Sequence, residues 1–109
     1  MSLHFPTPSE FAQHTIFPGV IVQTCSANKM MLCLATLQPN SIVELHSHPH
    51  EQVGMVIEGS VIFQIGDEKK TLVPGDMYRI PGNTKHRVVC LDKTAKVLDI
   101  FDPIREDYL

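Results

Sequence analysis

The sequence predicts an all-β fold, in which short strands form a sandwich or a barrel within a single domain. From Val20 onward, short apolar runs recur about every ten residues and are separated by turn residues. No stretch has the apolar period of an amphipathic helix. A chain of 109 residues, with 43% hydrophobic and 19% charged residues, has the composition of one globular domain with one core. Many short strands without helices are typical of sandwiches and barrels.

Each strand is predicted as an apolar run with turn residues at its two ends. Pro-Gly pairs at 74–75 and 81–82 end two runs, and Gly66-Asp67 predicts a hairpin turn. The proline-bearing segment 1–19 is predicted to be an irregular or edge-covering N-terminal arm, and 20–109 the β-barrel domain. The predicted strands span 20–24, 30–37, 41–48, 52–58, 60–65, 69–73, 76–80, 86–91 and 95–101.

Composition excludes several classes of function. The net charge is −3 and there is no basic run, so neither nucleic acid nor an anionic membrane is an expected partner. No apolar run approaches the ~20 residues that span a bilayer, and no signal peptide is evident at the N-terminus. The three cysteines are widely spaced and form no C-x-x-C motif, which indicates small buried thiols in a reducing cytoplasm. They are Cys25, Cys33 and Cys90.

Histidine is the feature that points to function. The chain has six histidines, and His46, His48 and His50 lie within five residues. In the predicted strand 41–48, Ile42, Glu44, His46 and His48 share one face. Two histidines at i and i+2 point the same way and can converge on one metal ion. Two solvent-facing histidines are the alternative that any H-x-H pattern allows.

The next predicted strand carries apolar residues on both faces. Val53, Met55 and Ile57 lie on one face and Val56 on the other. A strand that is apolar on both faces is expected to be covered on both. The barrel interior provides one cover. We predict that a second copy of the chain provides the other, in a homodimer.

Two segments together resemble the sequence motifs of the cupins. The first is HSHPHEQVGMVIEG at 46–59, and the second is GDMYRIPGNTKH at 75–86. They occur in the cupin order and spacing. Cupins are small double-stranded β-helix, or jelly-roll, proteins, so the resemblance implies that fold. Residue by residue, it also implies one divalent metal ion, which could be Zn, Ni, Fe, Mn or Co. The implied metal ligands are His46, His48, Gln52 and His86.

Three positions depart from the general cupin pattern. Gln52 stands where a glutamate is usual, so the ligand set leaves the ion its full +2 charge, which favours an anionic substrate and a Lewis-acid role. Glu51 and His50 remain alternative ligands, although spacing favours Gln52. Asn83 replaces a glycine and can adopt the same left-handed conformation. Cys90 replaces an asparagine and suggests a thiol near the cavity.

The last predicted strand contains an acid among apolar residues. Asp99 and Phe101 share a face, and burying a carboxylate is costly unless something uses it. An ion pair of Asp99 with Arg105 or with a neighbouring arginine is the alternative without catalysis. Pro103 ends the strand and would let Arg105 fold back toward the barrel mouth.

This tail, with HSHPHEQ and PGNTKH, resembles the KdgF-like cupins of pectin and alginate breakdown, which linearise unsaturated monouronates. The resemblance implies that Asp99 is an acid/base, Arg105 a clamp for the substrate carboxylate and Phe101 a wall of the sugar pocket. The implied partner is a small anionic sugar acid. Three alternatives remain: a metal-dependent dioxygenase, a cupin that binds a sugar or acid without turning it over, and a barrel with a purely structural metal.

Overall fold

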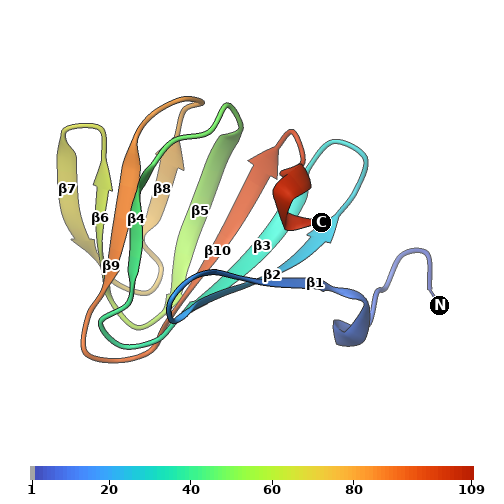
Figure 1. Ribbon diagram of the computed structural model, residues 1–109, viewed down its shortest axis with the longest axis horizontal. Helices are drawn as coiled ribbons and strands as arrows, with labels where there is room; N and C mark the ends of the chain where they lie inside the picture. The colour runs from blue at the N-terminus through green and yellow to red at the C-terminus, as the bar shows by residue number, and fades with distance from the viewer. Residues whose placement is uncertain (1) are drawn as a thin grey trace.

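The computed structural model describes residues 2–109, which form two antiparallel β-sheets (Figure 1). One sheet has six strands in the order β1-β2-β3-β10-β5-β8, and the other has four in the order β4-β9-β6-β7. Two short 3-10 helices lie near the ends of the chain, η1 (Pro8–Glu10) and η2 (Glu106–Tyr108). The strands are β1 (Ala12–Phe17), β2 (Val20–Ser26), β3 (Met31–Leu37), β4 (Ile42–His46), β5 (Glu51–Glu58), β6 (Val61–Ile65), β7 (Glu68–Leu72), β8 (Met77–Ile80), β9 (His86–Cys90) and β10 (Ala95–Asp102).

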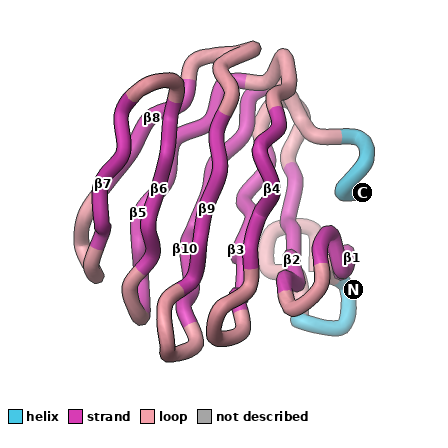
Figure 2. Tube along the Cα trace, turned by 60° about the vertical axis from the view of Figure 1, so that its left-hand side comes forward, coloured by secondary structure: helices cyan, strands magenta, loops and turns pink. Residues whose placement is uncertain are grey.

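The two sheets face each other and enclose one apolar core (Figure 2). Strand alternation produces it: in β2, β3, β9 and β10, buried side chains recur at every second position. The all-β jelly-roll prediction is therefore confirmed, and a strand lies at each range predicted between 20 and 101. The largest side chains with less than 2% exposure are Met31, Leu37, Ile80, Val20, Val22, Val56, Val61, Cys33 and Cys90.

The N-terminal segment contains a strand that the sequence did not predict. Ala12–Phe17 pair with β2 at the edge of the six-stranded sheet, so of the two expectations for this arm the irregular one is wrong for these residues and the edge-covering one agrees with the structure. The prolines flank this strand and do not interrupt it. Pro18 and Gly19 form the turn, and Gly19 has φ +78°, the sign that a type II turn needs at its third residue.

Strand β4 contains an irregularity that orients the histidines. Val43 pairs with Val88 and His46 with His86, so three steps along β4 match two steps along β9. This extra residue is a β-bulge, which shifts the alternation by one. The prediction that Ile42 and Glu44 share a face with His46 and His48 is therefore wrong, because the buried Val43 takes that face, whereas His46 and His48 do come together.

Two predicted turns have the expected backbone. Gly66 and Asp67 connect β6 to β7 directly, with Ile65 opposite Glu68 and Gly66 at φ +56°. Asn83, in the loop before β9, has φ +65°, the left-handed conformation expected for an asparagine that takes the place of a glycine.

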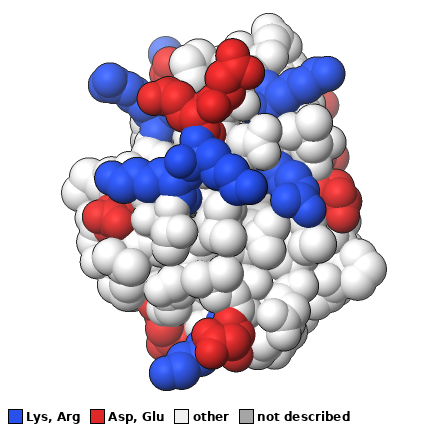
Figure 3. All heavy atoms as spheres, turned by 90° about the vertical axis from the view of Figure 1, so that its left-hand side faces the viewer, with Lys and Arg blue, Asp and Glu red and all other residues white. Residues whose placement is uncertain are grey.

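The outer face of the six-stranded sheet is apolar, in contrast to the end of the barrel near β7. Figure 3 shows Lys and Arg side chains in a band at that end, with acidic side chains beside it. Leu32, Val53 and Ile100 are about 40% exposed and lie side by side on three adjacent strands of the outer sheet face. Strand register extends this apolar face to two rows, which are Leu32–Ile100–Val53 and Leu34–Leu98–Met55–Met77.

Candidate metal centre

Three histidines converge where β4 and β9 meet at one end of the barrel. His46 is the last residue of β4 and lies opposite His86, the first residue of β9, while His48 lies two residues beyond β4. The ring centroids of His46 and His86 are 4.2 Å apart, and those of His48 and His86 are 4.9 Å apart. Each residue offers one ligand atom, and these atoms lie within 4.8 Å of one another. The three histidines could therefore bind a metal ion.

Backbone carbonyls hold all three imidazoles in one tautomer. Each Nδ1 lies 2.8–3.0 Å from a carbonyl oxygen, so it carries the proton and donates it. The lone pair of each ring is therefore on Nε2, as in histidines that bind metals. The pairs are His46 with Glu44, His48 with His50, and His86 with Thr84.

Gln52 could supply a fourth donor atom. Its side chain is buried on β5, and its Oε1 lies 3.1 Å from Nε2 of His48. With the amide in this orientation, both atoms are acceptors, because His48 uses its proton at Nδ1. A cation between them satisfies both lone pairs. The donor set of three imidazoles and one amide oxygen therefore fits a divalent transition metal.

Burial keeps the imidazoles in the form that binds metals. Desolvation lowers the pKa of His86 to about 4 and also lowers the pKa of His48. Both rings are therefore neutral at pH 7. Of the two alternative ligands, Glu51 is exposed, and His50 is outside the group of three histidines that the described residues form.

Asp99 lies inside the barrel beside this group. It is buried on β10 and accepts a hydrogen bond of 2.5 Å from the hydroxyl of Tyr78. Burial raises the pKa of Asp99 to about 6, although Tyr78, Gln52 and nearby Arg105 act against the rise. Gly54, which pairs with Asp99, makes room for both side chains, since a Cβ there would overlap Asp99 and Tyr78.

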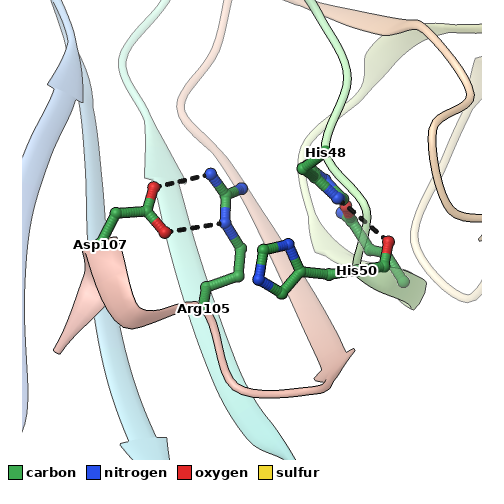
Figure 4. A network of polar contacts seen from close by, with 5 residues as sticks. His48, His50, Arg105 and Asp107 are labelled. Carbon is green, nitrogen blue, oxygen red and sulfur yellow. Dashed lines mark hydrogen bonds and ion pairs between the residues drawn. The ribbon is translucent and has the colours of Figure 1, made fainter.

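Arg105 reaches the cavity from the C-terminal tail, after β10 has ended. Its Nε and Nη2 donate to the two carboxylate oxygens of Asp107 over 3.3 and 2.8 Å (Figure 4). The guanidinium carbon lies 5.2 Å from the ring centroid of Phe101 and 4.0 Å from that of Tyr108. The ion pair expected as an alternative for Asp99 is therefore wrong, because Arg105 pairs with Asp107 and no other arginine forms an ion pair with Asp99 within residues 2–109.

Two hydrogen bonds fasten the tail over this end of the barrel. The hydroxyl of Thr24 donates to the carbonyl of Tyr108 over 2.9 Å, and Nε2 of His14 lies 3.1 Å from the carbonyl of Leu109. Tyr108 is buried as a result. In the sequence, the only indication that the tail packs against the barrel is its aromatic residue, Tyr108.

The cavity between these groups has a volume of about 50 Å³. Its wall includes Cys33, whose buried thiol lies opposite Asp99 in the β3–β10 pairing, whereas Cys90 packs elsewhere in the core. A thiol therefore does line the cavity, as expected, but it belongs to Cys33 and not to Cys90. Cys25 is exposed, so the prediction of buried thiols is wrong for it. The polar lining residues are His46, Gln52, His86, Asp99, Arg105 and Tyr108.

The comparisons with known proteins agree with this geometry. The cupin domain family matches residues 33–101. The chain is a cupin. It is 36% identical over 87 residues to the pectin degradation protein KdgF of Dickeya dadantii (strain 3937), a match that covers 79% of this chain and 78% of that protein. The structure of KdgF from Halomonas sp. superposes with a TM-score of 0.87 at 27% identity, covering 99% of this chain and 100% of that one. The resemblance to KdgF-like cupins is thus confirmed.

A second relative shows how widely this barrel is used. The cupin is 36% identical over 70 residues to an L-ectoine synthase of Mycolicibacterium vanbaalenii, but the match covers 62% of this chain and 53% of that protein. The match covers only part of each chain, so it carries no argument about activity. Within residues 2–109, no helix is long and apolar enough to cross a membrane.

Proposed function

We propose that this cupin is a metal-dependent enzyme that converts cyclic 4,5-unsaturated uronate monosaccharides to their linear keto form. The observation that carries the proposal is that one cavity joins Gln52 and two imidazoles of the three-histidine group, His46 and His86, to a buried acid, Asp99, and a guanidinium, Arg105. The pectin-degrading relative supplies the substrate class, because pectin is a polymer of uronates. The cysteines are unpaired, which suits a cytoplasmic location.

The proposed ligands of one divalent ion are His46, His48, Gln52 and His86. When bound, the ion supplies positive charge that stabilises negative charge developing on a substrate oxygen. Because no proposed ligand is anionic, the ligands do not offset the ion's +2 charge, and this favours an anionic substrate.

Asp99 is the proposed acid/base. It accepts the proton of the C1 hemiacetal hydroxyl, the bond between C1 and the ring oxygen breaks, and C1 becomes an aldehyde. The electron pair moves to the former ring oxygen as an enolate. Asp99 then returns a proton to C4, which leaves a ketone at C5. The sum is an isomerisation without an oxidant, and a carboxyl pKa of about 6 suits proton transfer in both directions.

Arg105 and Phe101 are the proposed binding residues. Asp107 occupies two of the five N–H donors of Arg105, and the other three include a second fork that fits the C6 carboxylate. Phe101 is buried beneath the guanidinium and forms a wall of the pocket.

The direct test is an assay of the metal-loaded protein on unsaturated galacturonate. We expect the ultraviolet absorbance of the C4=C5 enol ether to fall faster than in the spontaneous reaction, and NMR to show the open-chain ketone. Chelated protein is the control. A rate equal to the spontaneous one contradicts the proposal, and oxygen uptake by iron-loaded protein would favour a dioxygenase.

We also propose that the apolar outer face of the six-stranded sheet joins two copies of this chain. Its two rows run across adjacent strands, and a two-fold axis would place like rows against each other. Light scattering at micromolar concentration should give the mass of two chains. Ile100→Lys should give the mass of one chain, while Ile62→Lys, on the outer face of the other sheet, should remain a dimer. A wild-type monomer contradicts the proposal.

A further inference from the structure

Tyr108 carries a polar group that the proposed function does not use. It is the buried residue of η2 and forms part of the cavity wall. Its hydroxyl forms no hydrogen bond within residues 2–109. The hydroxyl nevertheless keeps accessible surface, because the only buried side-chain nitrogen or oxygen without a partner in that range is Nδ1 of His50. The hydroxyl of Tyr108 is therefore free to bind a group that enters the cavity.

The Tyr108 hydroxyl faces the cavity beside Arg105. The guanidinium carbon of Arg105 lies 4.0 Å from the centroid of the Tyr108 ring. Burial raises the pKa of the hydroxyl to about 12; Arg105 acts against the rise, while Cys33 and Asp99 are among the groups that add to it. Cys33 and Asp99 line the cavity, so their effect indicates that the hydroxyl points inward. A phenol with this pKa keeps its proton at pH 7 and can donate it in a hydrogen bond.

The chemistry of the proposed substrate brings its ring oxygen to this part of the cavity. In a 4,5-unsaturated uronate, the ring oxygen joins C1, which carries the reacting hydroxyl, to C5, which carries the carboxylate. With the carboxylate at Arg105 and the C1 hydroxyl at Asp99, the ring oxygen lies between these two residues. Tyr108 shares the cavity with both of them. In the proposed reaction, the same oxygen takes the electron pair of the broken bond and becomes the enolate oxygen.

We propose that Tyr108 is a substrate-contacting residue whose hydroxyl donates a hydrogen bond to the ring oxygen. This bond strengthens as the bond between C1 and the ring oxygen breaks, because the oxygen then gains negative charge. Tyr108 keeps its own proton throughout, so the proton transfers remain those of Asp99. The inference rests on the proposed function for its class of ligand.

Tyr108→Phe removes the hydroxyl and keeps the rest of the tail. Its ring can still pack on Arg105, and its backbone carbonyl can still accept the hydrogen bond from Thr24. We expect kcat on unsaturated galacturonate to fall about 100-fold, with KM and zinc affinity near their wild-type values, because a donor to a developing oxyanion contributes about 10²–10³-fold to kcat. Leu109→Ala, which shortens an exposed side chain of the same tail, should keep the wild-type kcat. A wild-type kcat in Tyr108→Phe overturns the inference.

A pair of probes tests the contact with the ring oxygen without turnover. Tetrahydropyran-2-carboxylate and cyclohexanecarboxylate differ only in whether an oxygen or a CH₂ group occupies that ring position. By calorimetry on zinc-loaded protein, Tyr108→Phe should bind the first about tenfold more weakly than the wild type does, the cost of about one hydrogen bond, and the second equally well. An equal loss for both probes, no loss for either, or a wild type that does not bind the first overturns the inference. If the probes behave as expected while the wild type leaves unsaturated galacturonate unconverted, the proposed function fails and the contact stands.

Discussion

Replacing His86 with alanine is expected to lower the affinity for a divalent metal by about 100-fold or more. His86 is one of the four proposed ligands, and its Nδ1–H···O bond to Thr84 already orients the ring. Loss of an outer hydrogen-bond partner of a ligand costs about 10–100-fold in metal affinity, so loss of the ligand should cost at least as much. Calorimetry with zinc on chelator-treated protein measures the change.

His4→Ala is the matched control, because His4 is an exposed histidine of the N-terminal arm. It should bind zinc like the wild type. Wild-type affinity in His86→Ala would contradict the assignment of the metal centre.

The same samples separate a catalytic metal from a purely structural one. The core fills the space between two sheets and does not depend on the histidines, which lie at one end of the barrel. Chelated protein should therefore keep the circular dichroism of a β-protein. Its free energy of unfolding should fall only by the contribution of metal binding to the folded state, about 2.7 kcal/mol at a metal concentration of 100 Kd, and its melting temperature should fall accordingly. Unfolding on chelation at room temperature would indicate a structural metal.

The sequence predicted the strands well because their pattern is local. Alternation and turn residues are set within a few positions, and they placed a strand at each expected range from 20 to 101. The bulge in β4 was not predictable in this way. His46 and His48 converge as expected, but the alternation before them is shifted, since the register of β4 is set by β9, forty residues along the chain.

The partners of the candidate site residues were missed for a related reason. Tyr78 donates to Asp99 across a separation of 21 residues, and Gly54 makes the space for that contact. The residues next to Asp99 in the sequence do not indicate that Tyr78 is its hydrogen-bond partner or that Gly54 makes the space for the contact. The ion pair between Arg105 and Asp107 is local in the sequence. That Arg105 pairs with Asp107 and not with Asp99 depends on where the tail folds after β10, which the local sequence does not show.

Asp99→Asn is expected to reduce the rate of uronate linearisation by about 10²–10⁴-fold while leaving metal affinity unchanged. Asparagine has nearly the same volume and keeps an oxygen that accepts the Tyr78 hydroxyl, so the buried site should remain packed. It loses the ability to take and return a proton, and general acid–base catalysis contributes about 10²–10⁴-fold. The ultraviolet assay on unsaturated galacturonate measures the rate, and calorimetry with zinc measures the metal affinity.

Asp102→Asn provides the control for this substitution, because Asp102 lies on the same strand but is exposed. Its rate should equal that of the wild type. If Asp99→Asn were as active as Asp102→Asn, another group would have to move the proton. Tyr78 could not do so as an anion, because burial raises the pKa of its hydroxyl far above neutrality. A fully active Asp99→Asn would therefore refute the acid/base role while leaving the metal centre and the binding role of Arg105 in place.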